Sequence, residues 1–200
     1  KVSTIFILLS LLIFFTSFVK SKIWFEFDSI FFLQKQFDEY FYQESSAKGH
    51  GVRGKDVVPL LSCSIRKEML KVLSYLRSHY KQLCLTNNIK TGIGAGMSST
   101  QKEAVATKKA MSVFNYIIES SKVGFRKPEK EIYELACEKL AMPCEQIVYL
   151  DDLGINLKPA RAMGMKTIKV RSERQAIADL GNILELDLVA LTKWQSAQDC

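Results

Sequence analysis

Short apolar runs alternate with helical stretches between residues 82 and 170, and this alternation constrains the fold more than any other feature of the sequence. The run 147–150 is β-branched and aromatic, which is typical of a strand buried on both faces. The apolar runs cover residues 82–88, 113–118, 147–150 and 166–170. Strands that alternate with helices form a parallel sheet with helices on both faces, so we expect a Rossmann-like α/β fold.

The helical stretches carry apolar residues at spacings of three and four, as amphipathic helices do. The clearest is 65–80, where Met69, Leu73, Leu76 and Tyr80 share one face. The expected helices are 37–48, 65–80, 102–111, one ending at 140 with Pro128 in its first turn, one from about 157, and one in the tail to 200.

Polar residues stand where the expected strands end or where helices begin. Asp151 and Asp152 directly follow the run 147–150, Thr86 and Asn87 follow another strand, and Lys127 precedes a helix. Two adjacent carboxylates repel each other, but at the carboxyl edge of a parallel sheet a divalent cation can neutralise them. Helix capping explains at most one of the two aspartates, so we favour a metal site.

These residue types together fit phosphoryl chemistry. A hydroxyl with backbone N–H groups, an ammonium and a carboxylate pair for Mg²⁺ are the parts that hold and neutralise a phosphoryl group. Each part alone is a weak signal. Their order along the chain and their placement at strand ends make the combination much more specific.

The segments LTNN, VGFRKPEKEIY and YLDDLGINLKPARAMGMKTIKV resemble the haloacid dehalogenase-like hydrolase superfamily. The similarity is to its phosphatase-type members, such as the N-terminal domain of soluble epoxide hydrolase, and it extends over residues 26–170. It implies a Mg²⁺-dependent phosphatase acting on a small phosphate ester. It also implies a helical cap that carries much of the substrate specificity.

The resemblance assigns roles to individual residues. Thr86 and Asn87 are implied to bind the phosphoryl group, and Lys127 to neutralise its oxygens and the attacking carboxylate. Of the aspartate pair, Asp152 is implied to be the direct Mg²⁺ ligand, with Asp151 supporting it. Asn156 matches a position that lines the same site.

The family's first motif, D-x-D-x-[TV], is absent from the sequence. Its first Asp is the nucleophile and its second the general acid-base, and the nearest candidate, Asp28, has Ile30 in place of the second Asp. We therefore expect weak Mg²⁺ binding and no turnover from these residues. The sequence is then a fragment, or its N-terminus has been replaced. The expected organisation is an apolar segment at 1–22, a partial helical cap and lead-in helix at 23–80, and the α/β core at 81–200.

Residues 2–19 contain no charge over eighteen positions, long enough for a membrane-spanning helix. The alternative is a buried strand that replaces the central first strand, whose absence would leave two neighbouring strands with unpaired backbone groups. We favour the membrane helix, anchored by Lys20 and Lys22. A second functional hypothesis follows, a membrane-tethered pseudoenzyme that binds a phosphate-bearing ligand without turnover.

The charge and the cysteine content of the sequence restrict the ligands and the cellular compartment that the protein can have. The net charge of +7 is scattered, without a run of five like charges, which argues against nucleic acid and favours small anionic substrates. The five cysteines form no C-x-x-C pair, so neither a disulfide framework nor a zinc site is indicated. We therefore expect the folded part in a reducing, cytoplasmic compartment.

Overall fold

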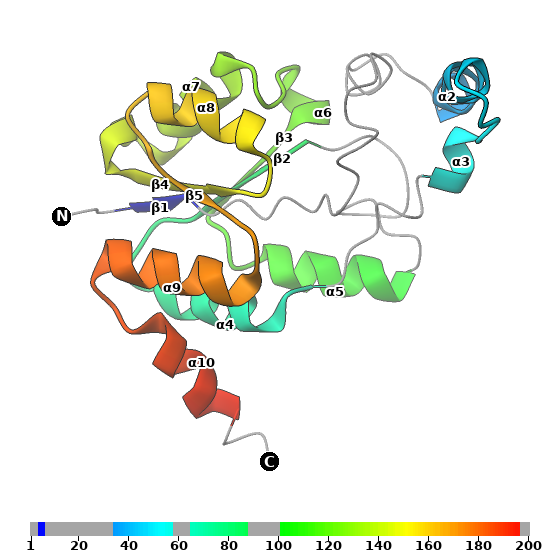
Figure 1. Ribbon diagram of the computed structural model, residues 1–200. Coiled ribbons are helices and arrows are strands. Elements are labelled where there is room, and N and C mark those ends of the chain that lie inside the picture. Colours follow the sequence, from blue (N-terminus) through cyan, green and yellow to red (C-terminus); the bar gives the residue numbers. More distant parts are fainter. Residues whose placement is uncertain (1–3, 7–33, 58–64, 88–100, 197–200) are drawn as a thin grey trace.

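A parallel β-sheet with helices against both faces forms the centre of the protein (Figure 1). The computed structural model describes residues 4–6, 34–57, 65–87 and 101–196. The strands are β1 (Thr4–Phe6), β2 (Leu83–Thr86), β3 (Tyr116–Glu119), β4 (Ile147–Asp151) and β5 (Lys166–Lys169). The predicted α/β class with parallel strands is confirmed.

Strand β4 lies between β1 and β5 and pairs with both in parallel. Strand β2 pairs in parallel with β3, and β1 also contacts β2. The described strands thus form two hydrogen-bonded sheets, β5-β4-β1 and β2-β3, which lie next to each other where β1 contacts β2. Parallel strands end at the same edge, so the carboxyl ends of β2 and β4 face a common space.

The helices form one layer on each side of the sheet, while α2 and α3 lie beside each other away from it (Figure 1). Helices α7 and α8 cover one face, and α4, α5 and α9 lie on the other. The longer helices are α2 (Gln34–Ala47), α4 (Lys67–Leu76), α5 (Gln101–Met111), α7 (Lys130–Leu140), α8 (Gly154–Ala162), α9 (Glu173–Leu184) and α10 (Leu188–Ser196). The short ones are α3 (Gly54–Val57), α6 (Ser120–Val123) and the 3₁₀ turn η3 (Cys144–Gln146).

Alternate residues of β4 enter two separate hydrophobic clusters. Val148 and Leu150 pack in the cluster on the α4 and α9 side, whereas Ile147 and Tyr149 pack in the cluster under α7 and α8. This follows from the two-residue period of a strand, which sends successive side chains to opposite faces. The prediction that β4 is buried on both faces is confirmed.

The prediction of one membrane helix over residues 2–19 is wrong at residues 4–6. These residues form β1, whose backbone pairs with β4 from Thr4 opposite Ile147 to Phe6 opposite Tyr149. The physical reason is backbone pairing. A strand at this position supplies hydrogen-bond partners to the backbone of β4, as the alternative of a buried strand assumed. Within the described ranges, no helix combines the length and hydropathy needed to cross a bilayer. Residues 7–19 and Asp28 lie outside the described residues.

Several helix predictions differ from the structure in their boundaries, and α4 ends at Leu76 rather than at residue 80. Helix α8 begins at Gly154, three residues earlier than expected, and Pro128 precedes α7 rather than lying in its first turn. The tail forms two helices instead of one. Glu185 adopts a left-handed conformation with φ of 60°, and the Leu186 amide turns back to the Gly181 carbonyl, so α9 ends there.

The cysteine spacing indicated no disulfide framework, but Cys137 and Cys144 form a disulfide with a Cα–Cα distance of 6.0 Å. Ala141 takes a left-handed conformation at the end of α7, and the Met142 amide donates to the Cys137 carbonyl. The chain therefore reverses between the two cysteines. The inference of a reducing compartment loses its premise, since it rested on the absence of a disulfide.

Gly181 of α9 lies where the turn toward α10 leaves no room for a side chain. A Cβ built there would lie 2.6 Å from the backbone oxygen of Leu186. We expect Gly181→Ala to lower the free energy of unfolding by about 1–3 kcal/mol through overpacking, despite the better helix propensity of Ala. Urea denaturation measures this.

The neighbouring exposed Asn182→Ala serves as the control, because it tests helix propensity alone. We expect Asn182→Ala to change stability by less than about 0.7 kcal/mol. A Gly181→Ala variant as stable as the wild type would show that the turn from α9 to α10 does not approach Gly181 so closely.

Candidate functional site

The predicted site residues converge at the carboxyl edge of the sheet. Thr86 ends β2 and Asp151 ends β4, while Lys127 comes from the loop before α7. The Lys127 Nζ lies 3.3 Å from the Asp151 Oδ2, although the residues are 24 positions apart. Their side chains are 3% and 0% exposed, so this is a buried ion pair.

Asp151 is surrounded by hydrogen-bond donors. Its Oδ1 accepts from the Leu153 amide at 2.7 Å and from the Asn156 Nδ2 at 3.1 Å. Its Oδ2 accepts from the Tyr149 hydroxyl at 2.8 Å, from the same Asn156 Nδ2 at 3.1 Å and from Lys127. A carboxylate has about four lone-pair sites, so these donors occupy Asp151 fully. It could ligate a metal only by giving up one of these bonds.

The hydrogen-bonding capacity of the Lys127 ammonium is only partly used. An ammonium carries three hydrogens, and Asp151 is its acceptor within the described part of the chain. Two hydrogens are therefore available to an anion at the edge of the sheet. Because the pair with Asp151 neutralises the buried charge, the ammonium is held in place at limited electrostatic cost.

Asn87 fixes the backbone of the Lys127 loop. The Asn87 Nδ2 donates to the Lys127 carbonyl at 3.0 Å, and the Lys127 amide donates to the Asn87 Oδ1 at 2.9 Å. This reciprocal pair links the end of β2 to the loop before α7. The predicted role of Asn87 was substrate binding, and here its amide positions Lys127. The Thr86 hydroxyl lies 3.4 Å from the Asn87 carbonyl, a weak contact that leaves it suited to another partner.

Asn156 also has a structural partner. It lies in the first turn of α8, where its Nδ2 contacts both oxygens of Asp151 and its carbonyl accepts from the Tyr133 hydroxyl at 2.7 Å. Asn156 was predicted to line the substrate site. In the structure it is buried and anchors Asp151 to α8.

Asp152, which the sequence predicts to be the direct Mg²⁺ ligand, is more exposed than Asp151. It is half-buried, directly follows β4, and its backbone carbonyl accepts from the Lys169 ammonium. Mg²⁺ prefers oxygen ligands and in proteins commonly uses one or two carboxylates with substrate oxygens and water. Asp152 fits that pattern as a single carboxylate. Within the described ranges, no group of three or more His, Cys, Asp or Glu is placed to hold a metal ion.

Sequence reasoning missed two buried tyrosines of the site. Tyr149 lies two residues before Asp151 on β4, hence on the same face, and its ring packs edge-on against Tyr133 with centroids 5.5 Å apart. Burial, then the nearby Asp151 carboxylate, raises the pKa of Tyr149 well above its usual value. Burial likewise raises the pKa of Tyr133. The two-residue spacing was the signal that could have found Tyr149.

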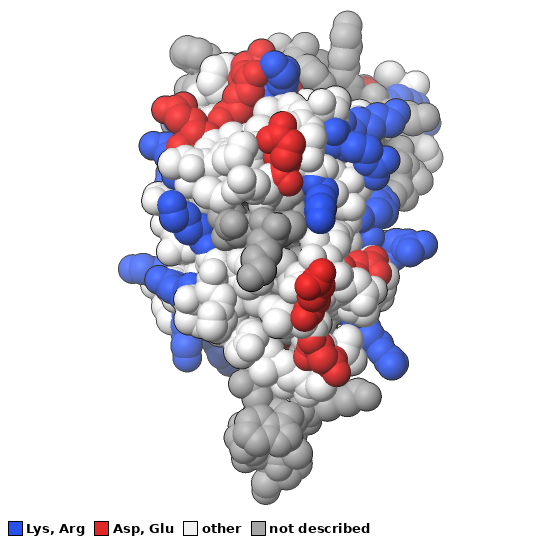
Figure 2. All heavy atoms as spheres, turned by 90° about the vertical axis from the view of Figure 1, so that its left-hand side faces the viewer, with Lys and Arg blue, Asp and Glu red and all other residues white. Residues whose placement is uncertain are grey.

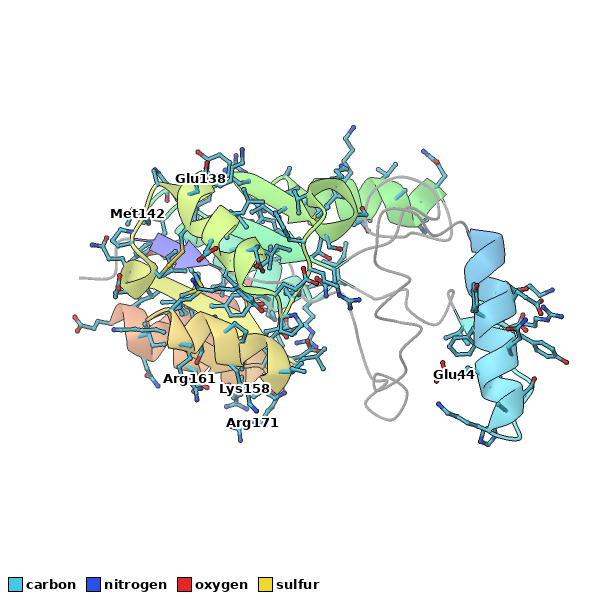
Figure 3. The ribbon with its side chains drawn as sticks, turned by 90° about the horizontal axis from the view of Figure 1, so that it is seen from above. Glu44, Glu138, Met142, Lys158, Arg161 and Arg171 are labelled. Carbon is cyan, nitrogen blue, oxygen red and sulfur yellow. A yellow bond between two sulfur atoms is a disulfide. The ribbon has the colours of Figure 1, made fainter. Side chains whose placement is uncertain are left out.

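The surface carries both signs of charge. On the face shown in Figure 2, acidic and basic side chains are interspersed. Lys158 and Arg161 of α8 and Arg171 after β5 are exposed and lie on one side of the molecule, where they point away from the sheet (Figure 3). With a net charge of +7, such a surface favours the approach of anions.

A family model described as haloacid dehalogenase-like hydrolase matches residues 33–170. A bifunctional epoxide hydrolase 2 from Rattus norvegicus is 34% identical over 124 residues, which are 60% of this chain and 21% of the relative. Acyl-CoA dehydrogenase family member 10 from Mus musculus is 30% identical over 121 residues, 60% of this chain and 10% of the relative. The chain thus spans about a fifth or less of the length of these relatives.

Solved structures share the fold. A predicted HAD-like family hydrolase from Porphyromonas gingivalis matches with a TM-score of 0.64 and 17% identity, covering 90% of this chain and 97% of that one. The HAD family enzyme bt-2542 from Bacteroides thetaiotaomicron, in complex with magnesium and inorganic phosphate, matches with a TM-score of 0.60 and 16% identity. That match covers 86% of this chain and 96% of the enzyme.

The buried ion pair leads to a stability prediction. Asp151→Asn removes the counter-charge and leaves the Lys127 ammonium buried without it, so we expect the free energy of unfolding to fall by about 3–5 kcal/mol. Urea denaturation measures the loss. The control is Glu134→Gln, which breaks the exposed pair with Lys130 and should cost less than about 1 kcal/mol. Equal effects of the two variants would contradict the assignment of a buried pair.

The tyrosines lead to a pH prediction. Their raised pKa values mean that the folded state favours the protonated phenols, so this contribution to stability is complete below pH about 10 and is lost as the pH rises above it. We expect the ultraviolet absorbance of tyrosinate to show late ionisation that coincides with alkaline unfolding. Tyr149→Phe and Tyr133→Phe should each remove one of the phenols that ionise at high pH from the absorbance titration. Ionisation of every tyrosine while circular dichroism stays native would contradict this.

Proposed function

The chain belongs to the haloacid dehalogenase-like hydrolase family, and we propose that its site binds the phosphoryl group of a small phosphate ester together with Mg²⁺. The observation that carries the proposal is the position of Lys127. Its ammonium is buried at the carboxyl edge of the sheet, is held by Asp151, and keeps two hydrogens for an anion within the described part of the chain.

The surrounding groups suit a phosphate better than a neutral substrate. Thr86 contributes a hydroxyl at the end of β2, and Lys127 contributes a positive charge that a phosphoryl group neutralises. Charge-assisted hydrogen bonds of this kind are stronger than neutral ones, and more so where water is excluded. The complex of bt-2542 with magnesium and inorganic phosphate supports the same ligand class for a protein of this fold.

Mg²⁺ is assigned to Asp152. When bound, Mg²⁺ would act as a Lewis acid that offsets the negative charge of the phosphoryl oxygens. Asp152 would supply the protein carboxylate, and Asp151 would hold the end of β4 and the start of α8 in place through its contacts with the Leu153 amide and Asn156. The remaining ligands would be phosphate oxygens and water, so we expect phosphate and Mg²⁺ to strengthen each other's binding.

Binding and turnover are separate parts of the proposal. The residues named above bind and orient the phosphoryl group, but hydrolysis through this family's chemistry also needs an aspartate nucleophile from a D-x-D-x-[TV] motif. The printed sequence has no such motif, and β1 has the sequence TIF, without a carboxylate. We therefore propose that these residues bind phosphate without turning over a phosphate ester.

Calorimetry with inorganic phosphate and Mg²⁺ tests the binding part. We expect measurable phosphate binding that weakens by at least about tenfold in Lys127→Met, the loss of one charge-assisted contact. Lys130→Met, which changes an exposed lysine three residues further on, should leave the affinity unchanged. Asp152→Asn should remove the enhancement by Mg²⁺ while retaining the folded circular dichroism spectrum.

An assay with an aryl phosphate and Mg²⁺ tests the turnover part. We expect no hydrolysis above the buffer rate, because removal of a covalent nucleophile commonly costs several powers of ten in rate. Clear turnover that disappears in Asp152→Ala would refute the claim that the missing motif is required. Absence of phosphate binding in the folded wild type would refute the proposed function itself.

A further inference from the structure

Three donors share one oxygen of the buried carboxylate in the site. The Asp151 Oδ2 accepts from the Tyr149 hydroxyl at 2.8 Å, from Asn156 at 3.1 Å and from the Lys127 ammonium at 3.3 Å. The contact with the charged group is the longest of the three. A tight ammonium–carboxylate bond would measure about 2.7–2.9 Å, so Lys127 is held loosely.

Building on the proposed function, we propose that Tyr149 is a positioning residue, whose hydroxyl occupies Asp151 and so keeps the Lys127 ammonium available to a phosphate. A carboxylate oxygen has two lone pairs. With the hydroxyl and the amide of Asn156 already bound there, Lys127 competes for a site that is filled. Its charge is then balanced by Asp151 without being fully engaged by it.

The placement of Tyr149 supports this role. Its side chain is fully buried, and its ring is packed against Tyr133, so the hydroxyl has a fixed position. The two-residue spacing on β4 places Tyr149 and Asp151 on the same face of the sheet. A phenylalanine would supply the same ring for the core. The hydroxyl therefore adds a donor aimed at Asp151 rather than packing volume.

Removal of the hydroxyl should change the balance between the three donors. Without it, the Asp151 Oδ2 has a free lone pair, and the Lys127 ammonium, now 3.3 Å away, is the donor that can approach more closely to fill it. The closer ion pair then competes with phosphate for the same ammonium hydrogens. The result is weaker binding of phosphate in a protein whose core packing is preserved.

The test compares Tyr149→Phe with the wild type by calorimetry, with inorganic phosphate and Mg²⁺ as the probe. We expect the affinity for phosphate to fall by about three- to tenfold, the usual range for one hydrogen bond. Ile177→Val is the control, because it removes one methylene from the hydrophobic cluster on the opposite face of the sheet. It should weaken folding without changing phosphate affinity.

A second readout follows Lys127 directly. In protein with labelled lysine ammonium groups, the Lys127 resonance is assigned by its loss in Lys127→Met. We expect this resonance to shift in Tyr149→Phe and not in Ile177→Val, because only the former changes the contact between the ammonium and Asp151. A purely structural role for Tyr149 would leave the resonance in place once the protein is folded.

The outcomes separate this inference from the proposed function. If the wild type binds phosphate and Tyr149→Phe binds it equally or more tightly, the inference is overturned and the proposed function stands. If Ile177→Val weakens binding as much as Tyr149→Phe, the effect follows stability and the inference is again overturned. If the folded wild type binds no phosphate, the proposed function fails first.

Discussion

The buried carboxylate of Asp151 is the interaction on which the site depends. A charge without solvent contact requires hydrogen bonds and a counter-charge, since leaving it unpaired would cost several kcal/mol. Lys127, Asn156 and Tyr149 supply them, together with the Leu153 amide. These partners come from β4, α8 and the loop before α7. One carboxylate therefore joins β4 and the start of α8 to the loop before α7, 24 residues earlier, and fixes the edge of the sheet at which they meet.

The two adjacent aspartates consequently have different surroundings. Asp151 is the last residue of β4, where its side chain lies on the α7 and α8 side and is fully occupied. Asp152 is one residue further on and half-buried, as the alternation of a strand predicts. Repulsion between the carboxylates is reduced because Lys127 and the other donors neutralise the inner one. The outer one is then suited to a cation brought by the ligand.

The sheet explains why residues 4–6 form a strand. Strand β4 needs backbone partners on both sides, and β5 satisfies only one of them. Residues 4–6 supply the other, and β1 contacts β2 as well. Unpaired backbone groups in a protein interior are costly, so pairing decides the structure of these three residues. Their composition suits a strand, since two of the three are Ile and Phe.

The sequence by itself determined the α/β class and the strands β2, β4 and β5, because these depend on the local hydrophobic period. Parallel strands also predicted that Thr86, Lys127 and Asp152 lie at one edge of the sheet. Tertiary structure decided what each polar group touches. Asn87 binds the backbone of Lys127, Asn156 binds Asp151, and Cys137 pairs with Cys144. Tertiary structure also decided residues 4–6, which were expected in a membrane helix over 2–19 and instead form β1 by pairing with β4. Such contacts depend on how the backbone turns and on which side chains that brings within bonding distance, and the hydrophobic period of the sequence encodes neither.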